Sequence, residues 1–476
     1  MIPVVLRTDA LLWLLVAAVA AYIVHVRRSP HLLVPWRRVT RSASGMSALI
    51  VFLVFIGIGL LDSIHFRPAL ETEDEKGATV YAVEAISVLD AIASPLRAHR
   101  ERTYSAPLAT RAYAKETIEI AEPGGRTRQV REFPRLIWGG AHLESEDDAA
   151  ADISVRAVAG LAGALVAWCA FAWTLTTWRA RAAGRTLKEE WRAIWRAETE
   201  TPWWSILLTS GALLAVACVT LALCTHYHVL GTEKVGQDVL YLVLKSIRTG
   251  LVIGTVTTLV LLPFAITLGI MAGYFRGWVD DIVQYIYTTV SSIPSVLLIA
   301  AAVLLMQVYI DQHPELFPTT AQRADLRLLF LCIILGLTSW TGLARLLRGE
   351  ALKLRELEYI QAAQAFGVRD RQVIARHILP NVMHIVLISL VMEFSGLVLA
   401  EAVLSYVGVG VDPTMISFGT MINAARLEMS REPIVWWILA AAFVFMFALV
   451  LSANLFADAV RDAFDPRVKV GGLARA

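Results

Sequence analysis

Residues 349–381 combine residue types and a spacing that suit docking by another protein. Their sequence is GEALKLRELEYIQAAQAFGVRDRQVIARHILPN, in which residues 350–366 are strong helix formers with small side chains at Ala362 and Ala363. Gly367 can take the left-handed conformation that ends a helix, and Asp370 suits the cap of a second short helix. Pro380 then opens the next segment, where its missing amide hydrogen costs little. The pattern predicts two short helices joined by a turn. The small side chains favour close approach by another surface, and a generic amphipathic loop is the alternative.

The sequence carries no motif for hydrolysis or redox chemistry. It has no Walker-type phosphate loop, no HExxH or GxSxG motif and no Rossmann glycine pattern. The cysteines lie in or at the end of apolar segments without a CxxC or a Cys/His cluster, which is typical of small core residues. They are Cys169, Cys218, Cys224 and Cys332. We therefore predict no catalytic residue, metal site or cofactor, and the net charge of +2 gives no sign of nucleic-acid binding.

Two acidic residues fall inside the apolar segment 382–406. Glu393 lies near its middle, where an ionisable side chain is costly and usually faces protein or water. It is a candidate for lining a translocation path and contacting a substrate amine, and a hydrogen-bonded packing role is the alternative. Glu401 lies near the outer end and is expected to be structural. Pro263 and Pro294 interrupt other apolar segments and should kink them, so Pro294 is a second candidate for shaping the path.

The composition around these residues is that of a polytopic membrane protein. Of 476 residues, 57% are hydrophobic and 18% are charged, against about 25% charged residues in ordinary soluble domains. This excludes a disordered tail, a disulfide scaffold and a typical soluble enzyme. A helix needs about 20 apolar residues to cross a bilayer, and continuous runs of this length exclude a membrane β-barrel. The candidate segments are about 10–26, 46–62, 155–178, 204–224, 249–272, 286–310, 327–345, 382–406 and 434–457. The predicted fold is an all-α, multi-pass helical bundle of about nine spans with a small external domain.

Basic residues predict the orientation of these spans. Segments 27–45, 179–203 and 346–381 and the C-terminal tail are rich in Arg and Lys and are expected in the cytoplasm. This places the N-terminus outside and the C-terminus inside. The first apolar run is expected to be a retained span, because its strong positive charge follows the run, the reverse of a secretory signal.

The connecting segments hold two further features. Residues 63–153 include acidic stretches and a Gly124–Gly125 turn, and are expected to form a small external domain of mixed α and β structure. Residues 186–198 place Leu187 and Trp191 at helical spacing with Ile194 and Trp195, opposite charged residues. This pattern predicts an amphipathic helix at the cytoplasmic membrane surface, and an elbow helix that packs against the next spans is the alternative.

The outer loop that follows residue 224 carries several polar side chains. His226 and His228 flank Tyr227 and are expected to lie at a solvated interface, and a pair that faces one ligand is the alternative. Asp238 either helps to fix the loop, contacts a binding protein, or caps a helix that begins at Val239.

Loop 349–381 resembles the EAA loop of ABC importer permeases. That loop has Glu-Ala-Ala, three residues, Gly and an end of the type Ile-x-Leu-Pro; the sequence here has Gln361-Ala362-Ala363, Gly367 and Ile378-Leu379-Pro380. Further stretches are similar to the second permease of dipeptide/oligopeptide (and nickel) importers, and Arg248 matches the arginine that opens a span there. They are LGTEKVGQDVL at 230–240, GYFRGWVD at 273–280, ARLLRGEAL at 344–352, AEAVLSYVGVGV at 400–411 and RDAFDPR at 461–467. The resemblance runs in order over about 200–467.

The sequence departs from this family pattern at several places. Gln361 replaces the glutamate of the EAA motif, so a charged contact is lost there and Asp370, Arg369 or Arg371 would have to supply polar contacts. Arg276 and Gln237 replace the usual Gly and Arg. Residues 1–200 exceed the family plan, which has one span before the LGT loop, so two or three extra spans and the external domain are unexplained by it.

The resemblance implies a permease subunit of an ATP-driven importer in the bacterial inner membrane, with ATP hydrolysis on other chains. The implied partners are a second related permease, two cytoplasmic ATPase subunits, an external substrate-binding protein and the lipid bilayer. The implied cargo is a peptide or peptide-like solute. The residues expected to couple the loop to the ATPase are Glu358, Gln361, Ala362, Ala363, Gly367, Arg369 and Pro380.

The expected domain division follows from the spans and the resemblance. It consists of two N-terminal spans with a basic loop (1–62), an external insertion (63–153), an extra span with an interfacial helix (154–203), the permease core (204–467) and a cytoplasmic tail (468–476). Two other functional classes stay open. One is an ion-coupled secondary transporter that uses Glu393, and the other is a membrane sensor that binds a ligand through residues 63–153.

Overall fold

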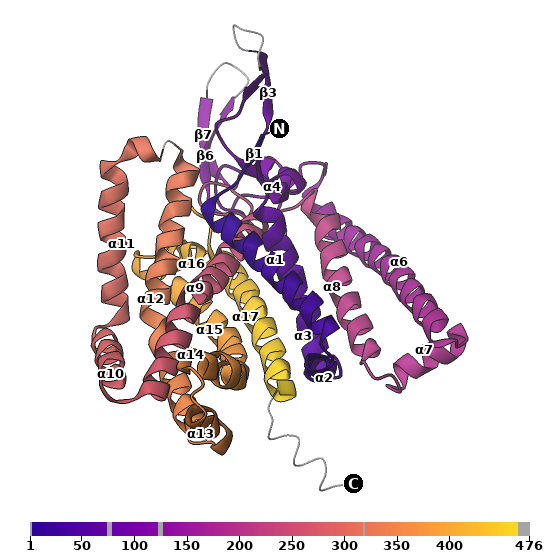
Figure 1. Cartoon of the computed structure of the whole chain (residues 1–476). Helices are drawn as coiled ribbons and strands as arrows, with labels where there is room; N and C mark the ends of the chain where they lie inside the picture. The colour runs from indigo at the N-terminus through magenta and orange to yellow at the C-terminus, as the bar shows by residue number, and fades with distance from the viewer. Residues whose placement is uncertain (1, 74–78, 122–126, 318, 465–476) are drawn as a thin grey trace.

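The computed structural model describes residues 2–73, 79–121, 127–317 and 319–464 (Figure 1). Within these residues, nine helices are long and apolar enough to cross a membrane, which confirms the predicted multi-pass helical fold. The helices at these spans are α1 (Arg7–Arg28), α3 (Ala43–Asp62), α6 (Ala149–Ala183), α8 (Trp203–Cys224), α9 (Val239–Phe275), α11 (Ser295–Gln312), α12 (Thr320–Arg355), α15 (Leu379–Val407) and α17 (Trp437–Phe464).

Helices α9 and α12 form the most extensive pair in the bundle, and glycines let their backbones approach closely. A Cβ atom added at Gly269 would lie 2.7 Å from the carbonyl oxygen of Ala344, and one at Gly273 would lie 2.5 Å from that of Arg348. Small residues at such positions allow the tight helix contacts that membrane bundles use. Helix α15 packs against α9 and α17, and the short α16 (Phe418–Glu428) lies beside both α15 and α17.

The N-terminal helices pack directly onto this bundle. Helix α3 lies against α17 and α9, and α1 lies against α12 and α9. The basic segment 27–45, expected as a loop, contains helix α2 (Pro30–Val39). Val39 of this helix is buried with Val460 and Ala463 of α17. This apolar contact fixes α2 against the end of α17.

The predicted span 286–310 is two helices rather than one kinked helix. Helix α10 (Gly277–Ser292) stops before Pro294, and α11 starts after it. The break follows from Pro294, which forces the preceding Ile293 into an extended conformation with ψ of 130°. Pro263 has the milder effect, because α9 runs through it as one helix.

Residues 63–153, expected to form an external domain and called the external domain below, combine short strands with short helices. Strand β1 (Ile2–Val4) from the N-terminus joins β2 (His65–Arg67) and β5 (Ile86–Ser87) in an antiparallel sheet, with α4 (Val88–Ile92) and α5 (Ser94–Ala98) next in the chain. Two antiparallel hairpins, β3–β4 and β6–β7, extend away from the helices (Figure 1). Their strands are β3 (Ala69–Glu73), β4 (Thr79–Tyr81), β6 (Glu116–Ala121) and β7 (Thr127–Glu132). The expected Gly124–Gly125 turn and the C-terminal tail lie outside the described residues.

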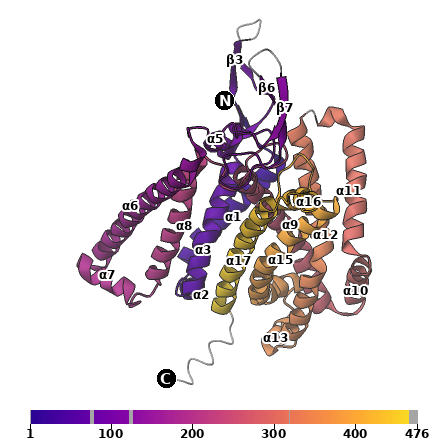
Figure 2. The ribbon, with the colours of Figure 1, turned by 180° about the vertical axis from the view of Figure 1, so that it is seen from behind.

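Helices α6, α7 (Leu187–Trp195) and α8 form a hairpin at one side of the bundle (Figure 2). The amphipathic helix predicted at 186–198 is α7, and the side chains of Thr186 and Glu189 form a capping box at its start. Ile194 is fully buried with Ala172 of α6 and Leu207 of α8. The elbow alternative therefore describes the contacts of α7, while its tryptophan face stays exposed.

Candidate functional site

The candidate coupling loop contains more breaks than the sequence predicts. Helix α12 ends at Arg355 and α13 covers Glu358–Ala365, so residues 350–366 are not one helix. Helix α14 (Asp370–Val373) follows and continues through a π-helical turn, Ile374–Ile378, into α15. Arg369 occupies the capping position expected for Asp370, because the Asp370 carboxylate instead accepts a hydrogen bond of 2.6 Å from the hydroxyl of Tyr274.

Gly367 ends helix α13 as its residue type predicts. Its φ is +74°, in the left-handed region that favours glycine. Its amide donates to the carbonyl of Gln364, and the amide of Val368 reaches back to the carbonyl of Ala363 at 3.1 Å. These bonds satisfy carbonyl groups at the end of α13 and turn the chain sharply toward α14.

The inner face of the loop is fixed to the bundle. Ile360, Val373 and Ile378 are fully buried in the core that contains residues of α9 and α12. The hydroxyl of Tyr274, near the end of α9, also accepts a hydrogen bond from the side chain of Gln364 at 3.0 Å. Tyr274 thus joins α9 to both short helices, a role that the sequence analysis missed although the residue lies in the family-like stretch 273–280.

The outer face of the loop is exposed. Most of the residues predicted for coupling are exposed. They are Glu358, Gln361, Ala362, Gly367, Arg369 and Pro380. Ala363 is half-buried and packs against the core. The sequence analysis missed Phe366, whose side chain is 88% exposed beside Gly367. A bare aromatic ring at the tip of a loop of small residues is the kind of group that a partner protein buries.

Ion pairs connect α10 to the helix that carries this loop. The guanidinium of Arg348 donates two hydrogen bonds of 2.6 Å to the carboxylate of Asp280. These bonds hold the pKa of Asp280 below its usual range. Arg276, which replaces the usual glycine of the family, forms an ion pair with Glu356 at the end of α12.

The two path candidates are not brought together. Glu393 is half-buried on α15 and has no hydrogen-bond or ion-pair partner among the described residues. Pro294 precedes α11, which packs against α12, whereas α15 packs mainly against α9, α16 and α17. Glu401 is 1% exposed and accepts hydrogen bonds from Ser405 and Ser417 at 2.7 and 2.8 Å. Those contacts give Glu401 a structural role.

The outer loop after α8 is buried beneath the external domain, so the expectation that His228 is solvated was wrong. Its Nδ1 lies 2.7 Å from the carboxylate of Asp238, and its Nε2 lies 3.4 Å from Glu101 of the external domain. Asp238 also accepts from the amide of Leu240 and is 1% exposed, so it fixes the loop and caps α9. No surface of Asp238 is left for a direct contact with a binding protein.

This buried trio has perturbed protonation equilibria. Burial alone would lower the pKa of His228, but the hydrogen bonds and charges of Asp238 and Glu101 raise it to about 9. Burial opposes ionisation of Glu101, yet hydrogen bonds from His228 and from the amides of residues 137–139 hold its pKa below the usual range. The interaction between His228 and Glu101 therefore ties the external domain to the loop that precedes α9.

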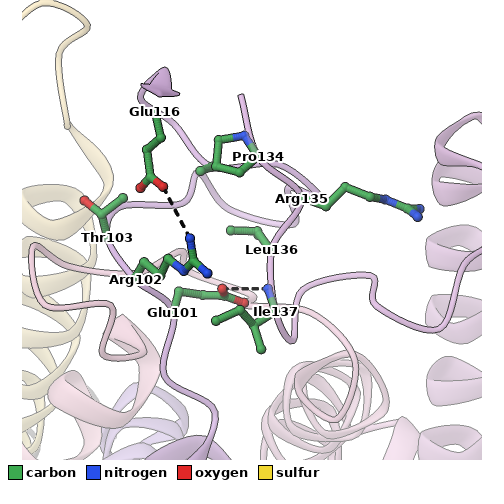
Figure 3. Close-up of a pocket in the computed structure, with 9 residues that line it drawn as sticks. Glu101, Arg102, Thr103, Glu116, Pro134, Arg135, Leu136 and Ile137 are labelled. Carbon is green, nitrogen blue, oxygen red and sulfur yellow. Dashed lines mark hydrogen bonds and ion pairs between the residues drawn. The ribbon is translucent and has the colours of Figure 1, made fainter. Parts of the chain in front are cut away.

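A cavity of about 230 Å³ lies in the external domain beside Glu101 (Figure 3). The Glu101 carboxylate accepts a hydrogen bond of 2.8 Å from the amide of Ile137, and Arg102 lies 3.8 Å from Glu116 across the cavity. Both acidic residues that line the cavity, Glu101 and Glu116, are therefore already paired with groups of the protein. None of the residues predicted for coupling or for the path lines it.

Comparison with known proteins identifies the relationship. Residues 265–470 match the family described as the binding-protein-dependent transport system inner membrane component. The oligopeptide transport system permease protein OppC of Mycobacterium tuberculosis is 33% identical over 239 residues, which cover 50% of this chain and 76% of that protein. The glutathione transport system permease protein GsiD of Pectobacterium atrosepticum is 32% identical over 242 residues, 51% of this chain and 73% of that protein. The dipeptide transport system permease protein DppC of Lactococcus lactis is 29% identical over 240 residues, 50% of this chain and 64% of that protein.

All three relatives are named as permease proteins of transport systems. The match runs from the last part of α9, at residue 265, through α17, and it includes the loop built from α13 and α14. The chain belongs to the binding-protein-dependent inner-membrane permease family, as a multi-pass permease subunit of the second type found in peptide ABC importers.

Proposed function

We propose that this permease carries peptides or peptide-like solutes and is driven through loop 349–381 by two separate ATPase subunits. The exposed surface formed by α13, Phe366 and Gly367 carries the proposal, because it is open to a partner and anchored from beneath by buried side chains. The cargo class rests on relatives whose names specify oligopeptide, dipeptide and glutathione transport. Peptides and glutathione share amide bonds and a free amine, and they define the chemistry of the proposed substrate.

The anchoring of the loop supports a mechanical role. Ile360 and Val373 are buried in the same core as residues of α9 and α12, and Tyr274 bonds to both Gln364 and Asp370. A displacement of α13 by a closing ATPase would therefore move α9, α12 and the start of α15 together. Such rigid-body motion of packed helices is how an allosteric element passes between two states.

Glu393 is the proposed path residue. It lies on α15 beside a stripe of exposed residues at helical spacing, which includes Met392, Leu399 and Val403. Among the described residues it has no polar partner, so its carboxylate is available to a substrate ammonium group or to a group of the partner permease. Pro294 shapes a helix on the other side of α12 and is not proposed to act with Glu393.

The orientation follows from the position of the coupling loop. The end of the molecule that carries α13 also carries α2, α7 and the described end of α17 (Figure 1), and we assign this end to the cytoplasm. Strand β1 belongs to the external domain at the opposite end. This assignment puts the N-terminus outside, where a substrate-binding protein approaches, and the C-terminus inside.

The experiment that tests the proposal is purification of the tagged chain from its native membranes in mild detergent. We expect a second permease and two ATPase subunits to copurify, with ATP hydrolysis stimulated by the loaded binding protein. A homo-oligomer without a nucleotide-hydrolysing partner, under conditions that keep a known importer intact, would overturn it. Family membership disfavours the alternatives of an ion-coupled transporter and of a membrane sensor.

A further inference from the structure

Residues 141–225 leave the external domain and return to it close to where they left. The amide of Gly140 donates a hydrogen bond of 2.9 Å to the carbonyl of His226. Between these two residues the chain forms α6, α7 and α8, which descend beside the bundle and return (Figure 2). We call residues 141–225 the arm. Its two ends are close enough that the chain on either side could be joined directly.

The arm is peripheral to the permease bundle. Helix α8 packs against α6, α3 and α7, and among the described helices after it in the chain α9 and α17 pack on α3. The contact with α3 is made by small hydroxyl side chains, with the hydroxyls of Ser47 and Ser205 2.5 Å apart and Thr209 donating to Ser47 at 2.9 Å. Helix α3 lies against both α17 and α9. It is therefore α3, and not α8, that packs as a span of the permease bundle.

The arm has a small core of its own. The indole nitrogen of Trp168 donates to the carbonyl of Leu207 at 2.7 Å, and a Cβ atom at Gly211 would lie 2.8 Å from that indole ring. At the tip, the carboxylate of Glu190 is fully buried, 2.7 Å from Arg179 and 3.5 Å from Arg185. These contacts fix α7 against α6 without help from the permease bundle.

The tip of the arm presents a basic and aromatic surface. Leu187, Trp191 and Trp195 recur every four residues along α7 and are 40%, 38% and 44% exposed. Exposed cations flank this stripe, and no ion pair joins them to any described acidic residue. They are Arg181, Lys188, Arg192 and Arg196. The two acidic residues of α7 are occupied, because Glu190 is buried against Arg179 and Glu189 is held in the capping box.

We propose that the arm is a separable membrane anchor whose tip binds the headgroups of anionic phospholipids. Amphipathic helices of this kind insert their apolar stripe at the headgroup boundary, where Trp is favoured, and draw in negative lipids through flanking Lys and Arg. The partner is the bilayer because the outer face of α6 is apolar along its length, with Val158, Leu165 and Trp173 at least 61% exposed. Only the assignment of the tip to the cytoplasmic leaflet rests on the proposed function.

The test measures phosphatidylglycerol retained by the full-length chain in its purified complex, using native mass spectrometry in mixed phosphatidylglycerol and phosphatidylcholine. The first variant carries Arg181→Gln, Lys188→Gln, Arg192→Gln and Arg196→Gln. The matched control removes the same charge from the external side through Arg100→Gln, Arg102→Gln, Lys115→Gln and Lys234→Gln. We expect the apparent affinity for phosphatidylglycerol to fall at least about tenfold in the first variant, since each basic residue near an anionic surface contributes attraction. The control should bind as the wild type does.

A second variant joins Gly140 directly to His226 and lacks the arm. It should lose the same phosphatidylglycerol while keeping its partner subunits and ATP-dependent uptake. Equal lipid retention in the tip variant and the wild type, or an equal loss in the matched control, would overturn the proposal. These readings are made on lipid bound to this chain, so they stand apart from whether ATPase subunits copurify, which tests the proposed function.

Discussion

The guanidinium of Arg248 donates two hydrogen bonds, of 3.0 and 2.6 Å, to one carboxylate oxygen of Asp9. The two residues are 239 positions apart, and both are nearly inaccessible to solvent. His65 lies 2.9 Å from the other oxygen of Asp9, and Asp325 of α12 accepts a hydrogen bond of 2.8 Å from the amide of Arg7. The N-terminal helix is therefore joined to α9 and α12 by buried charge, and it moves with the permease core.

Breaking this pair should be strongly destabilising. Asp9→Leu leaves the Arg248 guanidinium buried without its main partner, and loss of one member of a buried pair costs about 3–5 kcal/mol. We expect the double variant Asp9→Leu, Arg248→Met to recover much of that loss, because the buried guanidinium is removed together with its partner. The measurement is the unfolding midpoint in detergent. As a control, Glu84→Gln removes an exposed partner of Arg97 and should change stability by less than about 1 kcal/mol. A double variant as unstable as the single one would contradict this account.

Gly367→Asp should abolish transport and the stimulation of the ATPase while leaving membrane insertion intact. The substitution puts a charge on the proposed docking surface and a Cβ atom on a residue with a φ of +74°. Such backbone strain costs about 1–2 kcal/mol, which is too little to unfold the chain. The measurements are uptake in proteoliposomes and copurification of the ATPase.

The matched control for that prediction is Gly277→Asp. Gly277 also has a positive φ, of +55°, and its Cβ position is equally open, yet it lies at the start of α10 outside the coupling loop. It imposes the same kind of strain and the same charge. Normal uptake by the Gly367 variant, or an equal loss in both variants, would sink the docking role of α13.

The attachment of the external domain should weaken as pH rises. The folded pKa of His228 is raised from 6.5 to about 9, so its contribution is fully present below pH 6.5 and is lost as pH rises through about 9. A shift of this size corresponds to about 3 kcal/mol. The lowered pKa of Glu101 acts in the other direction, since its contribution is present above its usual pKa and is lost in acid. Stability should therefore be greatest between these limits.

The thermal unfolding midpoint, followed from pH 6.5 to 9.5, measures this effect. The wild type should lose stability across that range, and His228→Gln should start lower and show a flatter profile. His313→Gln is the control, because that half-buried histidine contacts only its own helix neighbour Tyr309 among the described residues, through its carbonyl and its ring. Parallel pH profiles for the wild type and His228→Gln would exclude the His228 pair as the source.

The contrast between Gly367 and His228 shows which features a sequence can predict. A helix end at Gly367 depends on one residue type and its neighbours, and apolar runs alone define the spans. His228 is buried because Glu101, 127 residues earlier, folds over it, and Asp370 loses its capping role to a bond with Tyr274 on another helix. The domain division expected from the sequence splits the arm among three domains for the same reason, since the hydrogen bond from Gly140 to His226 shows where it begins and ends.

Glu393→Gln should change which cargo is carried more than how fast the transporter cycles. The half-buried carboxylate has no described polar partner, and an amide of the same shape keeps the packing while removing the charge. We expect a rise in the substrate concentration needed for half-maximal uptake of peptides with a free amine, with little change for N-acetylated analogues. Uptake assays with both peptide forms give the comparison. Equal effects on both forms would assign Glu393 to packing.

Truncation of the two external hairpins separates docking from packing in the external domain. The base of this domain is needed by the core, because Lys245 of α9 lies 2.7 Å from Asp62 and 3.0 Å from Asp90 of α4. Deleting all of residues 63–153 would leave that lysine without Asp90, and the result would not be interpretable as lost docking. Hairpins β3–β4 and β6–β7 extend beyond this base, so short turns can replace them while these ion pairs remain.

If the hairpins enlarge the dock for the binding protein, their truncation should lower uptake several-fold when the loaded binding protein is limiting. Uptake at saturating binding protein, basal ATP hydrolysis and the unfolding midpoint should stay unchanged, because in the part of the chain that the structure describes each hairpin is a separate two-stranded sheet. The measurement is a titration of uptake with loaded binding protein in proteoliposomes. If the concentration of loaded binding protein that gives half-maximal uptake does not change, the hairpins have a role other than docking.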